Sequence, residues 1–507
     1  MATESKQAVL DKAKQFDLLL DNDAAGILGE RSDFELILRR LAENNEWFVS
    51  AARAKEEFER LDREARTHST GDESKKSGAF ERPKLNFRIL SQYDVTEQSF
   101  SEGTVKNFLE YFRKKFSVLS EMLRKRHGLS PRPISRLRAV NQNAEVDLVG
   151  MVFKKWITKN GHVALTLEDT ENTCIALVLK TDLKNTPLAQ TVLPDNVIAI
   201  KASKLSDDMV IIKDILFPDL PMRKKRLCPE GVNLVHISDI HVGSKLFMEK
   251  EFSAFLEWIS GRHIADPEEA EQVRRIKYLV ITGDNVDGIG VYPSQINELA
   301  IKDISKQYEA VATWLSRIPD DIEVFITPGN HDAVRNADPM PAIAPKFRFG
   351  LAEKKNVHFV GSPAWLEIEG LKMLLYHGGS FHDLISSVSF LDHDHPELAM
   401  RELLKKRDLM PSYGLKNTVV PEKTDFLTIQ EEPDYVFNGD MHKNGYVEYR
   451  GCTVINAGTW QDRTEYQVKL GHHPTPAIAV LVELDTGRVI EKNFQKNETK
   501  VVAVPAT

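Results

Sequence analysis

The chain has 507 residues, more than one hydrophobic core usually supports, so we expect about three domains. Its residues are 42% hydrophobic and 28% charged, as in ordinary soluble proteins. The net charge of −8 excludes a global attraction to nucleic acid, so any DNA binding must use local basic patches.

The cysteines and the N-terminus indicate a cytoplasmic protein. Cys174, Cys228 and Cys452 are far apart and lack the spacing of a zinc site, which favours a reducing compartment over a disulfide framework. We expect all three to be buried small hydrophobic residues. The first residues begin a charged helix and not a signal peptide, and no apolar run reaches the ~18 residues that span a bilayer. We therefore expect no membrane partner.

Three segments precede the first β-rich region. In residues 1–66 apolar residues recur at helical spacing, which predicts an all-α module used for interaction or docking. Residues 67–100 begin with a small, polar and charged stretch that cannot offset the entropy of ordering, so we interpret this segment as a flexible linker. Residues 101–140 are predicted to form an amphipathic helix and a connector, because Gly128 ends the apolar pattern.

Residues 141–222 change to an apolar period of two, which is typical of strands with one buried face. About five such strands predict a small barrel of the oligonucleotide/oligosaccharide-binding (OB) type. Lys154, Lys155 and Trp156 are candidates for DNA contacts, because such barrels bind single strands through basic and aromatic side chains. A barrel used for subunit packing accounts for the same pattern.

Residues 223–500 contain continuous apolar runs, the mark of strands buried on both faces. The runs 277–281 and 322–326 are the clearest, and helical patterns fill several of the gaps between them. This alternation predicts an α/β domain of layered type. The chain is therefore expected to be multidomain, with an all-α module, an OB-type β-barrel and a C-terminal α/β domain.

Five predicted strands in this last domain end in residues that can bind a metal ion. The five ends are Asp239-Ile240-His241, Gly283-Asp284-Asn285-Val286-Asp287, Gly329-Asn330-His331-Asp332, His377-Gly378-Gly379 and Gly439-Asp440-Met441-His442. Open α/β sheets place ligands outside the carboxyl ends of their strands, and hard or borderline cations bind oxygen and nitrogen donors held in tight turns. A purely structural role for all five turns would require repeated coincidence.

The order of these motifs resembles the calcineurin-like metallophosphoesterases, whose fold is a layered β-sandwich flanked by helices. The resemblance implies a first metal ion held by Asp239, His241, Asp284 and His442. It implies a second held by Asp284, Asn330, His377 and Asp440, with Asp284 as the bridge and His331 as the catalytic acid. The ions implied are Mn²⁺ or Mg²⁺.

Two such ions account for phosphodiester hydrolysis. Cations about 4 Å apart lower the pKa of a bridging water, bind the non-bridging phosphate oxygens and stabilise the in-line transition state. A neighbouring imidazole then protonates the leaving alkoxide. Asp287 and Asp332 fit better as residues that hold backbone donors and orient the ligands.

The last strand end departs from the superfamily pattern. The superfamily usually has Gly-His-x-His, where this chain has Asp440 in place of the first histidine. A carboxylate still binds Mg²⁺ or Mn²⁺, but it adds negative charge that weakens the attraction for phosphate. Metal binding is expected to persist. His382, His393 and His395, which follow the fourth motif, are either auxiliary ligands or solvated loop histidines.

The order of the domains resembles a narrower group, the small subunits of archaeal family D DNA polymerases, which are related to the B-subunits of eukaryotic replicative polymerases. Further local similarity lies in 287–293 and 459–467, and the resemblance covers nearly everything from about residue 90 onward. It implies a 3′–5′ exonuclease that proofreads single-stranded or mismatched 3′ ends beside a separate, large polymerase subunit, in a heterodimer or larger complex. Arg335 is a further candidate for contact with the DNA backbone.

Two other functions stay open at this point. Asp440 favours a catalytically silent scaffold that docks the large subunit through its barrel and phosphoesterase surfaces. A phosphodiesterase for small molecules is also compatible with the motifs, because a fold of this type serves many substrates. It leaves the barrel and the linker without a purpose.

Overall fold

The computed structural model describes residues 85–503 without a break and, ahead of them, separate stretches between residues 6 and 54. The described residues before 85 and those from 85 onward belong to two separate units. In the first, α1 (Lys6–Lys14) and α2 (Asn22–Gly29) accompany a parallel pair of strands, β1 (Leu19–Leu20) and β2 (Phe48–Val49). The described residues therefore do not form the all-α module expected at 1–66, since periodicity cannot identify so short an apolar pair as a strand.

Residues 85–100 belong to the second unit. Strand β3 (Phe87–Ile89) pairs antiparallel with β13 (Ala364–Ile368), and the 3₁₀ helix η1 (Ser91–Tyr93) follows. Phe87 packs edge-on against Phe325, with ring centroids 5.4 Å apart. The linker expected at 67–100 therefore does not extend over these residues, because a three-residue strand has no readable period and its partner is distant in sequence. Residues 67–84 lie outside the described part.

A closed five-stranded barrel follows the long helix α5 (Val105–His127) and the 3₁₀ helix η2 (Ile134–Ala139). Its strands in order around the barrel are β4 (Glu145–Ile157), β5 (Val163–Glu168), β6 (Thr173–Val178), β8 (Met209–Leu216) and β7 (Val197–Ser206). Helix α6 (Asn185–Thr191) lies between β6 and β7 in the chain. Alternate side chains of these strands fill the interior, as their period of two predicts.

Helix α5 joins the barrel to the rest of the unit. It begins with a capping box between Thr104 and Asn107 and ends at Gly128, whose φ of 60° is the left-handed geometry of a helix C-terminus. Leu119 and Leu123 pack on barrel strands β4 and β7. On another face, Lys115 Nζ lies 2.6 Å from Asp408 Oδ2, and both side chains are almost completely buried.

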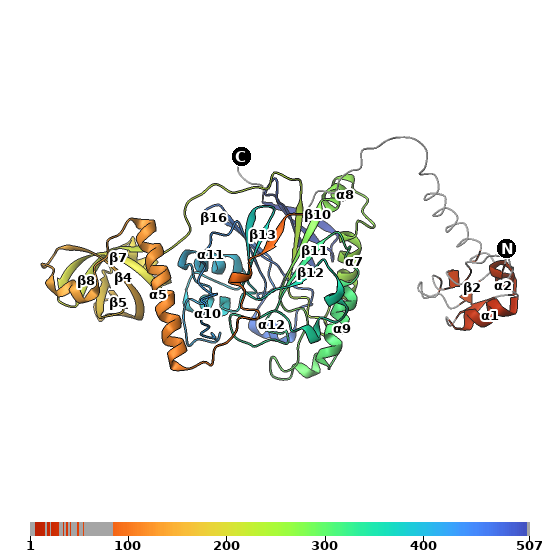
Figure 1. Cartoon of the computed structure of the whole chain (residues 1–507), viewed down its shortest axis with the longest axis horizontal. Coiled ribbons are helices and arrows are strands. Elements are labelled where there is room, and N and C mark those ends of the chain that lie inside the picture. Colours follow the sequence, from red (N-terminus) through yellow and green to blue (C-terminus); the bar gives the residue numbers. More distant parts are fainter. Residues whose placement is uncertain are drawn as a thin grey trace. The chain divides into compact units, whose positions relative to one another are not determined.

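The remaining strands form two mixed sheets (Figure 1). The seven-stranded sheet has the order β12 (Val357–Phe359), β11 (Glu323–Thr327), β10 (Ile276–Thr282), β9 (Asn233–Ile237), β18 (Ile478–Glu483), β19 (Val489–Asn493) and β20 (Glu498–Ala503). The six-stranded sheet has the order β16 (Gly445–Tyr449), β17 (Cys452–Asn456), β15 (Tyr435–Asn438), β14 (Leu371–Leu375), β13 and β3.

Helices cover the outer faces of both sheets. The seven-stranded sheet packs against α7 (Glu249–Ile259), α8 (Pro267–Arg274) and α9 (Ile304–Leu315). The six-stranded sheet packs against α10 (Phe381–Ser387) and α11 (Pro396–Lys406). A third core, which includes Tyr278, Phe325, Met373 and Phe437, fills the space between the sheets. The result is a four-layered sandwich of helices, sheet, sheet and helices.

This layering brings the motif-bearing strand ends together. Strands β9, β10 and β11 are parallel neighbours in one sheet, and β14 and β15 are parallel neighbours in the other. Their carboxyl ends therefore lie at the same edge of the sandwich. The three cysteines are buried and free, as expected. No described helix is both long enough and apolar enough to cross a membrane.

Candidate metal centre

Tight turns hold the motif residues at the strand ends. Asp239, His241, Asp284, Asp440 and His442 all have φ between 50° and 66°, the left-handed region that side chains with a Cβ rarely adopt. Such backbone conformations cost of order 1–3 kcal/mol each and persist only where surrounding structure imposes them. Glycine is required beside them: a Cβ added at Gly329 would collide with the Asp284 carboxylate, and one at Gly439 with Ser238.

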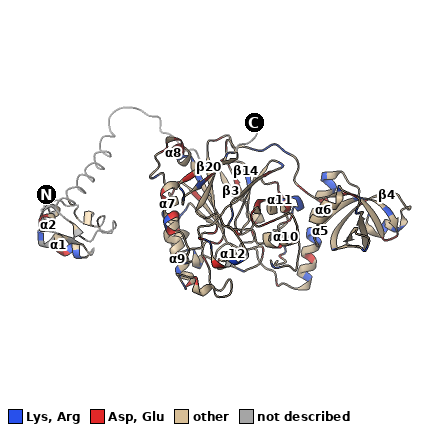
Figure 2. Ribbon diagram, turned by 180° about the vertical axis from the view of Figure 1, so that it is seen from behind, with Lys and Arg blue, Asp and Glu red and all other residues tan. Residues whose placement is uncertain are grey.

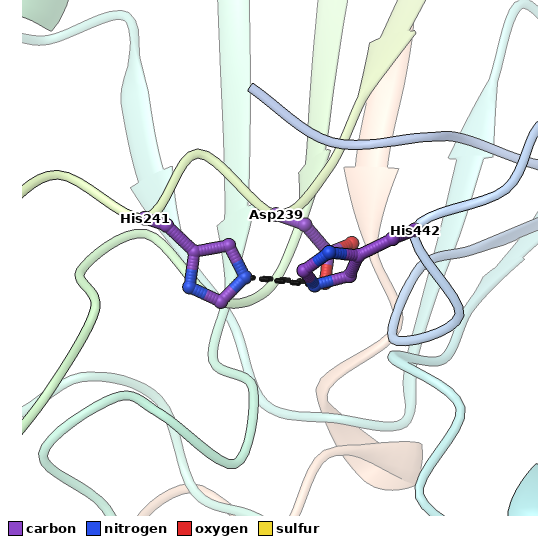
Figure 3. A group of neighbouring side chains, drawn as sticks. All are labelled: Asp239, His241 and His442. Carbon is purple, nitrogen blue, oxygen red and sulfur yellow. Dashed lines mark hydrogen bonds and ion pairs between the residues drawn. The ribbon is translucent and has the colours of Figure 1, made fainter. Parts of the chain in front are cut away.

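Asp239, His241 and His442 form the first cluster (Figure 3). His241 Nε2 and His442 Nε2 lie 2.9 Å apart. They lie 3.8 and 3.4 Å from Asp239 Oδ1, respectively. Asp239 Oδ1 is buried and accepts no well-formed hydrogen bond from the described residues. Because an orphaned buried carboxylate oxygen is costly, two imidazoles and a carboxylate that converge in this way fit a divalent cation.

Neighbouring side chains orient the two imidazoles of this cluster. Asp287 Oδ1 lies 3.1 Å from His241 Nδ1, which places the ring proton on Nδ1 and leaves the Nε2 lone pair for a metal ion. Burial lowers the pKa of His241, which favours the neutral form that a metal binds. His442 Nδ1 lies 2.8 Å from Gln467 Nε2, and Gln467 is itself fixed by a capping box with Thr464.

The second cluster surrounds His377. Its Nε2 lies 3.4 Å from Asp284 Oδ1, 3.0 Å from Asn330 Oδ1 and 3.7 Å from Asp440 Oδ1. Its Nδ1 lies 2.7 Å from the carbonyl oxygen of Thr282, which can accept the ring proton and leave Nε2 facing the oxygens. These donors suit a hard or borderline cation such as Mn²⁺ or Mg²⁺.

Asp284 belongs to both clusters. Its Oδ1 faces His377, and its Oδ2 lies 3.8 Å from His241 Nε2. Burial by itself would raise the pKa of this carboxyl group, but His377 and His331 hold it well below its ordinary value, so Asp284 stays ionised. The reverse effect of Asp284 raises the pKa of His377, against the effect of burial. A shared carboxylate of this kind is suited to bridge two cations.

His331 lies beside the two clusters. Its backbone N–H donates to Asp284 Oδ1 at 2.9 Å, and its Nδ1 lies 2.7 Å from the carbonyl oxygen of Asp287. Its Nε2 lies 4.0 Å from Asp284 Oδ2. The carbonyl contact orients the ring so that Nε2 is directed towards the shared carboxylate, where a general acid for the reaction is needed.

Asp332 supports the turn that carries Asn330 and His331. Its carboxylate accepts hydrogen bonds from Gly329 N, Asn285 Nδ2 and the hydroxyl of Tyr308 at 2.8 to 3.0 Å. Burial and the nearby Asp284 raise its pKa to about 6. Asp287 and Asp332 thus hold the loops and rings of their neighbours, as the sequence indicates for both residues.

The clusters open into a cavity of about 670 Å³. Its walls include residues outside the five strand-end motifs. Tyr292, Gln461 and Gln467 come from the two stretches of further local similarity, whereas no sequence pattern indicated Lys416, Asn417 and His472. Lys416 is the single lysine or arginine among the described residues that line it. Its segment lies between two recognisable elements and has no motif, so only the fold places it there. His382 and His393 also line the cavity, whereas His395 pairs with Glu397.

The candidates for DNA contact are not among the residues that line this cavity. Arg335 Nη1 lies 2.9 Å from Glu422 Oε1, and its Nε donates to the carbonyl of Pro339, so its guanidinium is engaged in holding loops together. The structure therefore argues against the backbone-contact role expected for Arg335. Lys155 Nζ donates to the carbonyl of Gln190 at 3.0 Å, and Lys154 Nζ lies 5.8 Å from the ring centroid of Trp156.

Basic and acidic residues occur together along helices of the second unit. Figure 2 shows both on the same helices, including α5 and α7. The mixture agrees with the small net charge of −8 in a chain of 507 residues.

Comparisons with known proteins agree with this geometry. The family model for calcineurin-like phosphoesterases matches residues 232–444, which carry all the motif residues.

Three similar curated relatives are each named DNA polymerase II small subunit. The protein from Archaeoglobus fulgidus is 39% identical over 79% of this chain and 80% of its own length. The one from Methanocaldococcus jannaschii is 36% identical over 78% of this chain and 66% of its own length. The one from Pyrococcus abyssi is 39% identical over 78% of this chain and 64% of its own length. This chain thus spans about two thirds of the length of the last two.

Proposed function

Because the chain belongs to the family of archaeal DNA polymerase II small subunits, we propose that it is the small subunit of a family D polymerase and hydrolyses DNA from the 3′ end. The large polymerase subunit would be its partner, and the hydrolysis would remove mismatched or single-stranded 3′ ends. The barrel, whose strand order is β4-β5-β6-β8-β7, would be of the OB type and would serve subunit or strand binding.

One observation supports hydrolysis above all others. The two clusters share Asp284, and donors from both sheets converge on it: His241 on one side and His377 on the other. This is the arrangement that two-metal phosphodiester hydrolysis needs, because a shared carboxylate keeps two cations close enough to act on one phosphate. The ions, when bound, would supply an activated water and bind the phosphate oxygens.

The side chains of the centre then have separate tasks in the proposed reaction. Asp239, His241 and His442 form one binding set, and Asn330, His377 and Asp440 form the other, with Asp284 common to both. Attack of water on phosphorus breaks the bond to the 3′ oxygen of the preceding nucleotide. His331, oriented by the carbonyl of Asp287, donates its Nε2 proton to that leaving oxygen.

Replacement of His331 by alanine tests this proposal. We expect wild-type protein to shorten a 5′-labelled DNA with a 3′ single-stranded tail in the presence of Mn²⁺, one nucleotide at a time. In His331→Ala, kcat should fall by roughly 10²- to 10⁴-fold, the usual contribution of a general acid, while Mn²⁺ binding is retained.

His395→Ala is the matched control, because His395 is an exposed histidine outside the cavity and should retain wild-type activity. Equal residual activity in wild type and His331→Ala would contradict the exonuclease proposal. Cleavage of a nitrophenyl phosphodiester without any cleavage of DNA would point to a small-molecule substrate instead.

The second candidate function is a scaffold for the large subunit. Asp440 supports it, because a carboxylate in place of the usual imidazole adds negative charge where phosphate must bind. Mn²⁺ binding with no hydrolysis of any DNA end, alone or with the large subunit, would favour this scaffold role.

A further inference from the structure

Asp440 has two oxygens in different surroundings. Oδ1 lies 3.7 Å from His377 Nε2, on the side of the second cluster. Oδ2 is buried and has no hydrogen-bond partner in the described part of the chain, and the side chain as a whole is only 10% exposed. A buried, ionised oxygen without a partner is energetically costly. A neighbouring donor would therefore stabilise this carboxylate.

His382 is positioned to be that donor. It lies in α10, and its Nε2 is 3.7 Å from Asp440 Oδ2, somewhat longer than a hydrogen bond. Its Nδ1 lies 3.3 Å from His393 Nε2. The His393 ring in turn stacks on His472, with centroids 4.5 Å apart and planes at 26°. His382, His393 and His472 thus form a row of neighbouring rings that runs from Asp440 along the cavity wall.

One direction of the hydrogen bonds places a proton of His382 on the side of Asp440. If His393 Nε2–H donates to His382 Nδ1, the proton of a neutral His382 is on Nε2, where it faces Asp440 Oδ2. The opposite oxygen, Oδ1, is then left to face His377. Carboxylates that bind metals are commonly held in this way by a second hydrogen-bonded group, which restricts their rotation.

We propose that His382, supported by His393, is a positioning residue that orients Asp440 so that this carboxylate serves as a ligand of the second metal ion in place of an imidazole. This inference rests on the proposed function of the site as a two-metal centre. It explains how the chain tolerates the exchange: a histidine side chain ends in a rigid ring, whereas a shorter carboxylate rotates unless its second oxygen is held. His382 supplies that restraint from a different element, α10.

Titration of the full chain with Mn²⁺, with free Mn²⁺ followed by its electron paramagnetic resonance signal, tests the proposal. Wild type should bind two ions. In His382→Ala the weaker ion should bind roughly 10- to 100-fold less tightly, the usual effect of removing a group that supports a ligand, and the tighter ion should be unaffected. His395→Ala, a matched histidine outside the cavity, should bind both ions as wild type does.

A double-mutant cycle shows whether His382 acts through Asp440. In Asp440→His there is no second carboxylate oxygen to hold, so adding His382→Ala should have no further effect on either affinity. The proposal is overturned if wild type binds two ions and His382→Ala binds both unchanged, or if His382→Ala has the same effect in the Asp440→His background. Binding of a single ion by wild type would instead overturn the two-metal function, and this inference with it.

Discussion

In the proposed reaction, Lys416 is the side chain of the cavity wall best suited to contact a DNA phosphate other than the one that is hydrolysed. Asp383 accepts the backbone N–H groups of Lys416 and Asn417 at 3.1 and 2.8 Å, and Asn417 Nδ2 donates to Asp338 Oδ2 at 2.7 Å. The segment is therefore fixed, although the lysine itself is exposed. A fixed backbone beneath a long cationic side chain is suited to follow a phosphate chain of variable sequence.

For Lys416→Ala we expect KM for DNA to rise roughly 10-fold with little change in kcat, because the lost contact is to a phosphate away from the reacting bond. The dependence of log KM on log salt concentration should become shallower by about one unit, since one fewer counterion is released on binding. Lys423→Ala, a change at an exposed lysine outside the cavity, is the control. Identical salt dependence in Lys416→Ala and wild type would exclude this contact.

At the level of elements, α5 is held to the phosphoesterase layers by a buried ion pair. Lys115 Nζ lies 2.6 Å from Asp408 Oδ2 and donates to the carbonyl of Met410 at 3.1 Å. Burial raises the pKa of Asp408 to about 6, although Lys115 acts to lower it. A buried pair of this kind contributes little net stability while intact, but removal of one partner leaves a buried charge uncompensated.

Lys115→Met should therefore lower the free energy of unfolding by about 3–5 kcal/mol at pH 8. The folded-state pKa of Asp408 exceeds its ordinary value of 3.8, so its contribution to stability falls as pH rises from 3.8 to about 6 and then stays constant. Without Lys115 the pKa of Asp408 rises further, so its contribution to stability continues to fall at higher pH. Urea unfolding should thus show that Lys115→Met loses less free energy of unfolding relative to wild type at pH 5.5 than at pH 8. An equal loss at both pH values would contradict the explanation by an uncompensated Asp408 carboxylate.

At the level of the whole molecule, the metal centre joins the two sheets of the sandwich. Asp239, His241 and Asp284 follow strands of the seven-stranded sheet, whereas His377 and Asp440 follow strands of the six-stranded sheet. Ligands from both sheets that bind the same pair of ions would link these two layers. Metal binding should therefore stabilise the folded chain as a whole, because the unfolded chain does not bring these residues together.

We expect Mn²⁺ at 100 times its dissociation constant to stabilise the protein by about 2.7 kcal/mol per site, and a chelator to reverse the effect. Thermal unfolding followed by circular dichroism measures this as a rise in Tm. Asp284→Asn, which removes the shared carboxylate charge, should show little or no rise. The same rise in wild type and Asp284→Asn would mean that the ions bind elsewhere.

Local sequence was sufficient for features that depend on short stretches of chain. The continuous apolar runs predicted buried strands, the period of two predicted the barrel strands, and Gly128 predicted the end of α5. Each motif residue follows its strand directly, so the strand-end turns were readable too. Very short strands were not readable: β1 and β2 have two residues each and β3 has three, so they carry no period, and the partner of β3, β13, lies far along the chain.

The sequence by itself therefore determined the longer strands, the end of α5 and the residue types at five strand ends, because these depend on neighbours in the chain. Tertiary structure alone decided which of those residues meet. It placed His382 against Asp440 and Lys416 on the cavity wall, and it engaged Arg335 with Glu422. The physical reason is that such contacts depend on how two sheets stack and on which loops their edges bring together. No local pattern in the sequence encodes the distance between residues that are far apart in the chain.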